Sequence, residues 1–508
     1  MTAEAQATAA TDIDVRPNRA TLLVYLSALV AMFMATMDMQ IVVTALPTIA
    51  GELGNLHLFG WVGSAYLLAT AAVSPFYGKL GDMFGRKPVV MFAIALFLVG
   101  SAACGFAWSM ETLIAARVLQ GLGGGGLMVS AFAIIGELFA PRERAKYQGY
   151  TSAVFALSSI LGPVAGGYLT DLFGWRSVFL VNLPIGAVVL AIIYFAMQRK
   201  SDVRQHVVDY TGGILLAFAT TVLVYWSDHV LDPSGADLWT YAMPVAVVLA
   251  IAAFIMVERR AVEPIIPLRL FGNSTTSLVT VISVLTGMGT LGQFFFMALY
   301  VQTITGLSPA QVGFLFLPAS AASLVTSMIA GRIIAATGHY KWLPVISMAI
   351  GVGMMLVFAI MNAQTSLWAY AGMFVVFGVS MGLQMQVLMV AIQASAPLKD
   401  IGAATGLMTQ ARTVGASLGL ALNGAIMTWA LTQQSATLPA DAATAVPGGL
   451  TALSPHAATA LAPGLRDTVL AHYSAGFATM FTFVAGLYAA AFVLTLFLKD
   501  VEIPKRAI

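Results

Sequence analysis

Charged residues are scarce in this sequence. Only 9% of its residues are Asp, Glu, Lys or Arg, whereas 59% are hydrophobic. Soluble domains carry about 25% charged residues, so the composition excludes a soluble globule and predicts an all-α polytopic membrane protein. The net charge of +2 says nothing by itself about acidic partners, and we expect no nucleic acid among them.

Residues with reactive side chains are also few. The single cysteine, Cys104, lies in an apolar run and excludes an intrachain disulfide. All six histidines fall in predicted loops, so no buried histidine-based metal or acid–base centre is expected. A Walker phosphate loop is missing, and the GxGxxG and GxSxG matches lie inside apolar segments and not at strand–helix turns. We therefore expect a protein that is not an enzyme and uses neither a metal nor a bound cofactor.

Apolar runs recur along the whole chain, and a helix of about 20 such residues crosses a bilayer. The first twenty residues carry charges and no apolar core, so we predict a tail there and no cleavable signal peptide. We count fourteen runs, at residues 21–49, 61–77, 89–108, 112–135, 150–169, 178–197, 212–226, 241–257, 278–301, 312–330, 343–361, 368–392, 403–430 and 475–498.

The positive charges predict the orientation of these spans. With the N-terminus and every second loop assigned to the cytoplasm, 20 of the 24 Lys and Arg residues fall on that side. The exceptions are Arg117, Arg176, Arg412 and Arg466. This asymmetry favours fourteen helices with both termini in the cytoplasm.

A weak internal repeat divides the chain into two bundles. Gly78 and Gly85 recur at the same spacing as Gly331 and Gly338. Paired bundles of this kind place a binding site at their interface, near the middle of the bilayer. The predicted parts are a cytoplasmic tail (1–20), a six-helix bundle (21–200), two additional helices (201–271), a second six-helix bundle (272–499) and a cytoplasmic tail (500–508).

Two stretches between apolar runs are predicted to be loops. Residues 78–88, GKLGDMFGRKP, should form a short cytoplasmic turn in which Asp82 caps a helix or pairs with an arginine. Residues 431–474 are rich in Ala, Thr and Pro, which predicts a flexible extracytoplasmic loop with a short helix near residues 465–473.

Asp38 is the one acidic residue of the 22 that lies deep inside an apolar run. A charged, unpaired carboxylate there costs several kcal/mol or more, so it must be paired, protonated or solvated. Arg117, with Gln120 one turn later, is the expected partner. The pair either exchanges a proton during a transport cycle or is a static ion pair that holds helices together.

Glycine-rich helix faces accompany this pair. Gly121 and Gly123–Gly126 are expected to let another helix pack closely. Gly162, Pro163, Gly166 and Gly167 in LGPVAGG form either a hinge or a plain packing face.

Further polar residues within the apolar runs should face the interior of the bundle. Arg412 mirrors Arg117, and it either contacts substrate, couples to the cycle or binds helix carbonyls. Aromatic and methionine side chains could supply an adaptable apolar pocket. The candidate cavity residues are Gln40, Gln120, Gln293, Phe294, Gln384, Gln386, Gln410 and Arg412.

Together these motifs resemble the major facilitator superfamily, in its fourteen-helix drug:proton antiporter branch (EmrB/QacA type). GKLGDMFGRK is similar to the loop between the second and third helices of that superfamily. MDMQIVVTALPTI, RVLQGLGGGG and LGPVAGG resemble the motifs of the first, fourth and fifth helices of the branch. The resemblance covers residues 21–499.

The resemblance implies alternating access driven by inward proton flow, with export of amphipathic compounds across the bacterial inner membrane. It implies proton coupling at Asp38 and Arg117, and an antiport hinge at Gly162, Pro163, Gly166 and Gly167. A periplasmic adaptor and outer-membrane channel would be partners in a Gram-negative source. The cytoplasmic gate would comprise Gly78, Asp82, Gly85, Arg86 and Lys87.

The sequence departs from relatives that export organic cations, which look to have additional carboxylates in later helices. Residues 312–330 and 403–430 carry none, and Arg412 adds a positive charge. Neutral, zwitterionic or weakly acidic hydrophobic substrates are therefore favoured. The alternative to a multidrug exporter is a dedicated exporter of one metabolite, siderophore or lipid on the same fold.

Overall fold

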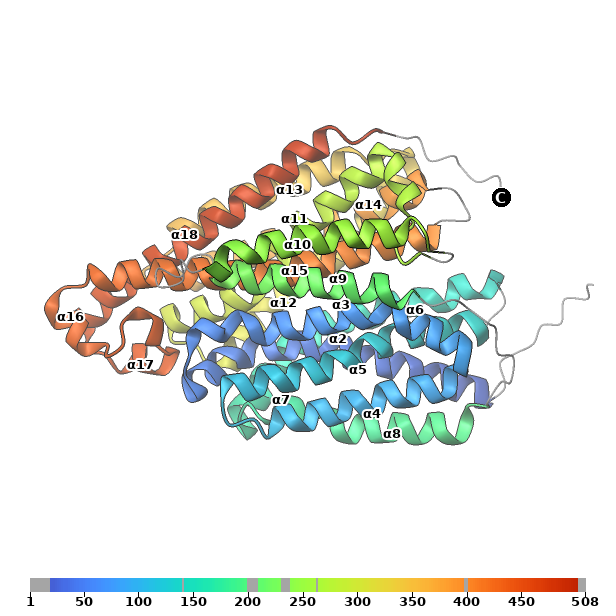
Figure 1. Cartoon of the computed structure of the whole chain (residues 1–508). Helices are drawn as coiled ribbons and strands as arrows, with labels where there is room; N and C mark the ends of the chain where they lie inside the picture. Colours follow the sequence, from blue (N-terminus) through green and yellow to red (C-terminus); the bar gives the residue numbers. More distant parts are fainter. Residues whose placement is uncertain are drawn as a thin grey trace, which may run out of the picture.

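The computed structural model describes residues 19–138, 141–198, 209–229, 238–261, 264–396 and 401–500. Every regular element within these ranges is a helix (Figure 1). Thirteen of the described helices are long and apolar enough to cross a membrane. The predicted all-helical polytopic membrane protein is confirmed.

One predicted span, at residues 150–169, is not among those thirteen. It lies in α6 (Pro141–Phe173), a helix of 33 residues that packs against α2 and α12. The side chains of residues 141–150, and of several residues after them in α6, lie outside the described residues, so the span at 150–169 stays a prediction.

The first group of helices packs around α5, which contacts α2, α3 and α4. Five glycines of α5 allow this: a Cβ on Gly121 would lie 2.5 Å from the Tyr66 carbonyl oxygen of α3, and one on Gly123 would lie within 2.3 Å of Phe97 of α4. The predicted packing role of this glycine run is confirmed. The group comprises α2 (Arg19–Leu53), α3 (Phe59–Phe84), α4 (Arg86–Gly105), α5 (Met110–Leu138), α6, α7 (Ser177–Leu180) and α8 (Asn182–Ala196).

The second group is built in the same way, with α11 packed on α15 and α18 and with α12 packed on α14. It comprises α11 (Ser274–Thr305), α12 (Pro309–Thr337), α13 (Trp342–Ile360), α14 (Leu367–Ser395), α15 (Ile401–Ala436) and α18 (Pro463–Leu496). The short 3-10 helices η1 (Leu56–Leu58) and η2 (Leu268–Gly272) precede α3 and α11.

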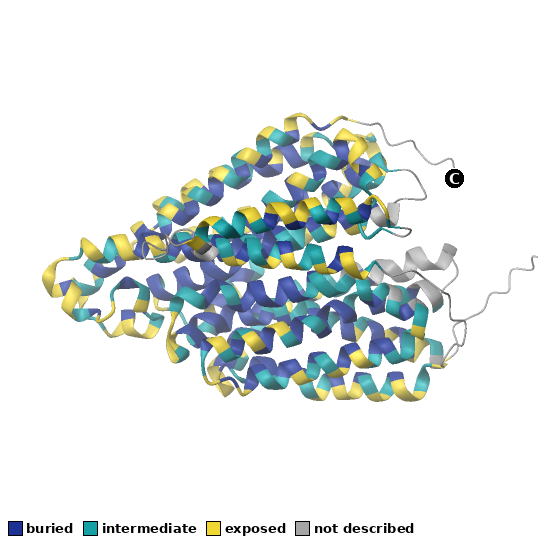
Figure 2. Cartoon of the chain, viewed as in Figure 1, coloured by how far each residue is buried: buried dark blue, intermediate teal, exposed yellow. Residues whose placement is uncertain are grey.

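Two more helices, α9 (Tyr210–His229) and α10 (Leu238–Glu258), lie side by side between the groups (Figure 1). α9 contacts α3 of the first group and α15 of the second. Its Tyr210 stacks on Phe76 with ring centroids 5.8 Å apart. α10 exposes a row of large apolar side chains, as expected of a lipid-facing helix (Figure 2): Tyr241, Val245, Val248, Leu249 and Met256.

The predicted loop at residues 78–88 is wrong in extent. α3 continues to Phe84 and α4 begins at Arg86, so Gly85 alone separates the two helices. Gly85 has a φ of 86°, a conformation that favours glycine. Helical hydrogen bonding does not stop where apolar residues stop, which is why the charged stretch is mostly helical. The repeat partner Gly338 ends α12 in the same way, with a φ of 77°.

The predicted flexible loop at residues 431–474 is also wrong in extent. α15 runs to Ala436 and α18 starts at Pro463, so residues 465–473 belong to a long helix and form no separate short one. Between them lie α16 (Ala440–Ala445), η4 (Leu450–Ala452) and α17 (Pro455–Ala460). Leu450, Leu453 and Ala458 are buried, so the alanine-rich composition conceals a packed segment.

The histidine prediction needs a smaller correction. Four of the described histidines lie in helices and not in loops: His57 in η1, His229 at the end of α9, His456 in α17 and His472 in α18. Within the described ranges, no three His, Cys, Asp or Glu side chains are grouped as metal ligands would be.

Candidate functional site

Asp38 lies at the centre of a buried polar cluster inside the first group. Its side chain is fully buried, and one of its carboxylate oxygens accepts a hydrogen bond from Arg117 Nη1 at 2.5 Å. The other oxygen accepts from Gln120 Nε2 and from Asn182 Nδ2, both at 2.8 Å. Three donors and no acceptor surround the carboxyl group, an arrangement that fits the ionised form.

Arg117 is fully buried and well supplied with partners. Its Nη1 also donates to Gln120 Oε1 at 2.7 Å, and its Nε donates to the Val62 carbonyl of α3 at 3.1 Å. The guanidinium carbon lies 4.3 Å from the centroid of the Tyr66 ring, a cation–π distance. Nη2 has no hydrogen-bond partner within the described residues. The predicted pairing of Asp38 with Arg117 is therefore present in the structure.

The sequence analysis missed two members of this cluster. Asn182, at the first residue of α8, also donates to Ser101 Oγ at 3.0 Å. Ser101 of α4 accepts from Gln120 Nε2 and donates to the Phe179 carbonyl. Both are neutral residues within apolar runs, and the only available signal was their polarity. They join α4, α7 and α8 to the ion pair.

The two groups of helices touch along one half of their length. We call the end where α2 begins and α18 ends the terminus end, and the opposite end, which carries α16 and α17, the loop end (Figure 1). Ser64 of α3 and Ser417 of α15 exchange hydrogen bonds with each other's carbonyl oxygens at 2.9 and 3.1 Å. Gln302 of α11 donates to the Thr44 carbonyl of α2 at 3.0 Å.

α6 and α12 cross closely where the two groups meet. At the loop end, Asp171 accepts hydrogen bonds from the Ser308 hydroxyl and the Ala310 amide at the start of α12. Gln410 of α15 donates to the Ala71 carbonyl of α3 at 3.2 Å. We call this line of contacts between α3 and α15 the joint between the groups. Beyond these positions the helices diverge toward the terminus end (Figure 1).

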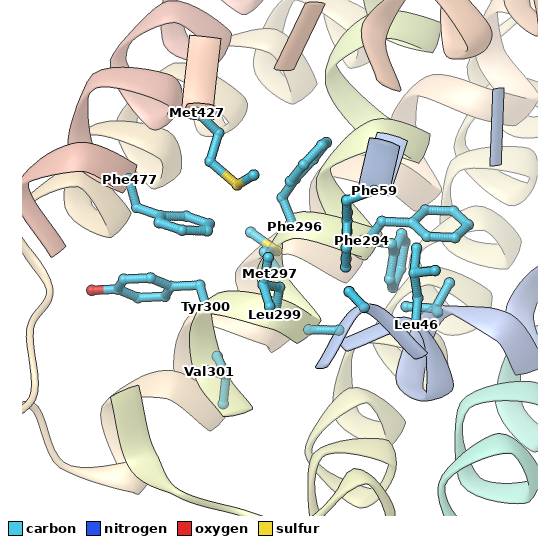
Figure 3. Close-up of a cluster of buried hydrophobic side chains, with 14 of the residues drawn as sticks. Leu46, Phe59, Phe294, Phe296, Met297, Leu299, Tyr300, Val301, Met427 and Phe477 are labelled. Carbon is cyan, nitrogen blue, oxygen red and sulfur yellow. The ribbon is translucent and has the colours of Figure 1, made fainter. Parts of the chain in front are cut away.

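An apolar cluster fills the bundle near the loop end (Figure 3). Phe59 of α3 and Phe296 of α11 bring the two groups together, with ring centroids 5.4 Å apart. Phe294 packs edge-on against Phe377 of α14 at 4.9 Å. Leu46 contributes from α2 (Figure 3). Buried aromatic contacts of this kind pack the bundle densely near the loop end.

The predicted hinge residues lie at helix crossings. A Cβ on Gly162 would lie 2.4 Å from the Cβ of Gln40 on α2, and one on Gly167 would lie 2.5 Å from Ala310 on α12. On the facing helix, a Cβ on Gly313 would lie 2.4 Å from the Pro163 carbonyl oxygen. Gly166 packs against Ile41 in the same manner. Close packing is thus present, and bending at Pro163 stays a prediction.

The predicted gate residues contact their own group. Arg86 Nη1 donates to the Gly78 carbonyl of α3 at 2.9 Å. Lys87 donates to the Tyr194 carbonyl of α8 at 2.7 Å. The side chain of Asp82 lies outside the described residues. The gating role stays a prediction.

The predicted cavity residues do not come together in one place. Gln120 belongs to the Asp38 cluster, and Gln40 is half-buried beside Gly162. Gln293 and Phe294 are buried in the second group, where Gln384 donates to Thr290 Oγ1 at 2.9 Å. Gln410 lies in the joint between the groups, and Arg412 is half-buried near it. The side chain of Gln386 lies outside the described residues.

Comparison with known families identifies the class to which this fold belongs. Residues 28–420 match the family model of the Major Facilitator Superfamily. The chain therefore belongs to the major facilitator superfamily. It is a transporter and not an enzyme, and transporters of this superfamily use ion gradients rather than bound cofactors.

Several relatives have names that refer to drug transport. The multidrug transporter protein MdtP of Bacillus subtilis is 32% identical over 400 residues, which cover 78% of this chain and 74% of that protein. Multidrug resistance protein 3 of the same species is 33% identical over 423 residues, which cover 82% of this chain and 81% of that protein. An uncharacterized MFS-type transporter of Mycobacterium tuberculosis is 31% identical over 484 residues, which cover 95% of this chain and 70% of that protein.

Solved structures support the fold. A bacterial homologue of the human lysosomal transporter Spinster, in an inward-facing and occupied conformation, superposes with a TM-score of 0.71 at 13% identity, over 95% of this chain and 97% of that one. A D-xylose–proton symporter superposes with a TM-score of 0.59, also at 13% identity, over 92% and 97%.

Proposed function

We propose that this protein is a proton-coupled antiporter that exports amphipathic or hydrophobic compounds by alternating access. It belongs, on this proposal, to the fourteen-helix drug:proton antiporter branch (EmrB/QacA type). The observation that carries the proposal is the sealed carboxylate of Asp38, held by Arg117, Gln120 and Asn182. Relatives named as multidrug transporters at 32–33% identity support the export of drugs.

Protonation of Asp38 would change the contacts of Arg117. A neutral carboxyl group binds a guanidinium far less strongly than a carboxylate does. Arg117 would then depend on the Val62 carbonyl, Gln120 Oε1 and the Tyr66 ring. The proton thus shifts the balance of forces on α3, the helix that carries both Val62 and Tyr66.

α3 leads directly to the joint between the groups. Val62 is two residues from Ser64, which is bonded to Ser417 of α15. A Cβ on Gly60 would lie 2.5 Å from the Leu420 carbonyl oxygen of α15, so the two helices cannot slide without disturbing each other. Movement of Arg117 on protonation would therefore favour opening of the loop end, and deprotonation would favour closing it.

The proposal includes the orientation of the chain. Both termini would lie in the cytoplasm of a bacterium, with α16 and α17 on the outer side of the inner membrane. The terminus end, where the helices diverge, would then face the cytoplasm and take up substrate. In a Gram-negative source, a periplasmic adaptor and an outer-membrane channel would be partners.

Asp38→Asn tests the coupling. Asn keeps nearly the same shape but does not titrate. Because Arg117 retains the Val62 carbonyl, Gln120 Oε1 and the Tyr66 ring, we expect the variant to insert and to bind substrate within a few-fold of the native protein. Uphill export should be lost, while exchange down a substrate gradient persists. The measurement is pH-gradient-driven efflux in everted vesicles, normalised to folded protein.

Asp38→Glu is the matched control, since it keeps the carboxyl group one methylene further out. We expect partial export with a shifted pH optimum. Full pH-gradient-dependent efflux by Asp38→Asn would contradict the proposal. Export of a single compound, with no competition from unrelated amphiphiles, would instead identify a dedicated exporter.

A further inference from the structure

Arg412 is a cation inside a membrane-spanning helix without a partner in the described part of the structure. It lies in α15 eleven residues after Ile401, which is about 16 Å along the helix axis, and within the span Ala404–Ala436. It is half-buried. No described carboxylate, amide or carbonyl oxygen lies within hydrogen-bond distance of its guanidinium, in contrast to Arg117.

Arg412 forms no ion pair with a described acid of the helices that pack against α15. α11 and α14, which pack against α15, contain no charged residue. On α3 the nearest acid along the chain is Asp82. The Gln410–Ala71 hydrogen bond fixes the alignment of α3 and α15, and it places the backbone of Asp82 about 20 Å from that of Arg412 along the helix axes.

Arg412 belongs to a polar stripe on α15. Thr405 and Thr409 lie seven and three residues earlier, on the same helix face. Thr409 is exposed and Thr405 is half-buried, whereas Ala416, the next residue on this face, is fully buried. The accessible stripe therefore starts at the terminus end and stops just beyond Arg412. It follows the part of α15 from which the first group diverges (Figure 1).

We propose that Arg412 binds the anionic group of the transported compound, so that the preferred substrates are amphipathic carboxylates and not organic cations. This inference rests on the proposed export function. A guanidinium binds a carboxylate through two parallel N–H···O hydrogen bonds. An uncompensated charge within a membrane span is costly and usually marks a functional site. A bound carboxylate would supply the negative charge that no described acid pairs with Arg412.

Binding to the purified full-length protein at neutral pH, without a proton gradient, tests the inference. The probes share one skeleton: 2-naphthylacetate, its primary amide and naphthylmethyl-trimethylammonium. We expect the native protein to bind the carboxylate most tightly. Arg412→Gln should weaken carboxylate binding about 10- to 100-fold and amide binding less than about threefold. Arg412→Lys should lose less, because the charge remains.

Arg332→Gln is the charge-matched control. Arg332 is an exposed arginine of α12, away from the α15 stripe, and its loss should leave all three affinities unchanged. Since Arg412 makes no described contact that holds the fold, Arg412→Gln should also express and melt like the native protein. Loss of folding in both Arg412 variants would indicate a structural residue and overturn the inference.

Three binding results would also overturn it: an equal loss for the carboxylate and the amide, an unchanged carboxylate affinity in Arg412→Gln, or tighter binding of the ammonium than of the carboxylate by the native protein. These measurements need no coupling to protons. The binding measurements can therefore contradict the role of Arg412 while export still depends on Asp38. They can also support that role while Asp38→Asn leaves export intact and contradicts the proposed proton coupling.

Discussion

The two helix groups have a similar arrangement but opposite polar interiors. In the first, an ion pair is buried and nearly every polar atom around it is bonded: Asp38 has three donors, and Ser101 and Asn182 are bonded to the same cluster. In the second, the buried polar side chains are neutral amides and hydroxyls. Several of their atoms lack a partner among the described residues, namely Gln293 Oε1, Gln384 Oε1 and both polar atoms of Asn423.

This difference separates two tasks. A carboxyl group that gains and loses a proton needs surroundings that strongly stabilise one of its two charge states. The first helix group supplies such surroundings around Asp38. Neutral amides can exchange hydrogen-bond partners at a low cost in free energy. The second helix group can therefore tolerate different substrates beside it. We infer that proton handling lies in the first group and substrate recognition mainly in the second, where Arg412 is a half-buried cation without a described partner.

Arg117→Gln should have the largest effect. It leaves the Asp38 carboxylate buried with two amide donors and no cation, which costs about 3–5 kcal/mol. We expect a large loss of folded protein and no export. Folded protein is measured by size-exclusion chromatography of a fluorescent fusion.

The double variant Asp38→Asn/Arg117→Gln sharpens this result, because it removes both charges together. It should recover most of the folded protein without recovering export. If the double variant folds no better than Arg117→Gln, the ion pair is not the source of the loss, and the contrast between the two groups is weakened.

The fold and the ion pair were accessible from the sequence for the same reason. In a membrane, a long apolar run can pair its backbone hydrogen-bonding groups in few ways, of which the helix is the main one. A charged side chain inside such a helix needs a partner of opposite charge. Helix ends were less predictable. Residues 79–84 continue α3 despite Lys79 and Asp82, since helical bonding outlasts the apolar pattern.

The neutral members of the site could not be found in this way. Asn182 and Ser101 look like any polar residue of an apolar run, and only the crossing of α4, α5 and α8 places them beside Asp38. The cavity prediction collected glutamines by residue type, and it stays a prediction. The structure distributes them among the ion-pair cluster, the second group and the joint.

Asn182→Leu should have an intermediate effect. It removes one donor from Asp38 and one from Ser101, at a cost of about 1–3 kcal/mol. Because that donor is bonded to the carboxylate, its loss should also change the pH optimum of efflux. A lower melting temperature with an unchanged optimum would show that Asn182 supports the fold without tuning the proton site.

Asn423→Leu should have the smallest effect, although Asn423 is as deeply buried as Arg117. Neither its Nδ2 nor its Oδ1 has a described partner, so the amide was removed from water without compensation. Replacing it with a branched apolar side chain recovers that cost and adds apolar contact, offset by the tight approach of Gly292, where a Cβ would lie 2.9 Å from Nδ2. We expect stability to be unchanged or raised by about 1 kcal/mol, with export retained, as measured by thermal melting in detergent and efflux in vesicles. Asn182→Leu is the matched comparison, since the same exchange there removes real hydrogen bonds. If Asn423→Leu is as destabilising as Asn182→Leu, the amide of Asn423 has a partner such as bound water, and the second group is as fully satisfied as the first.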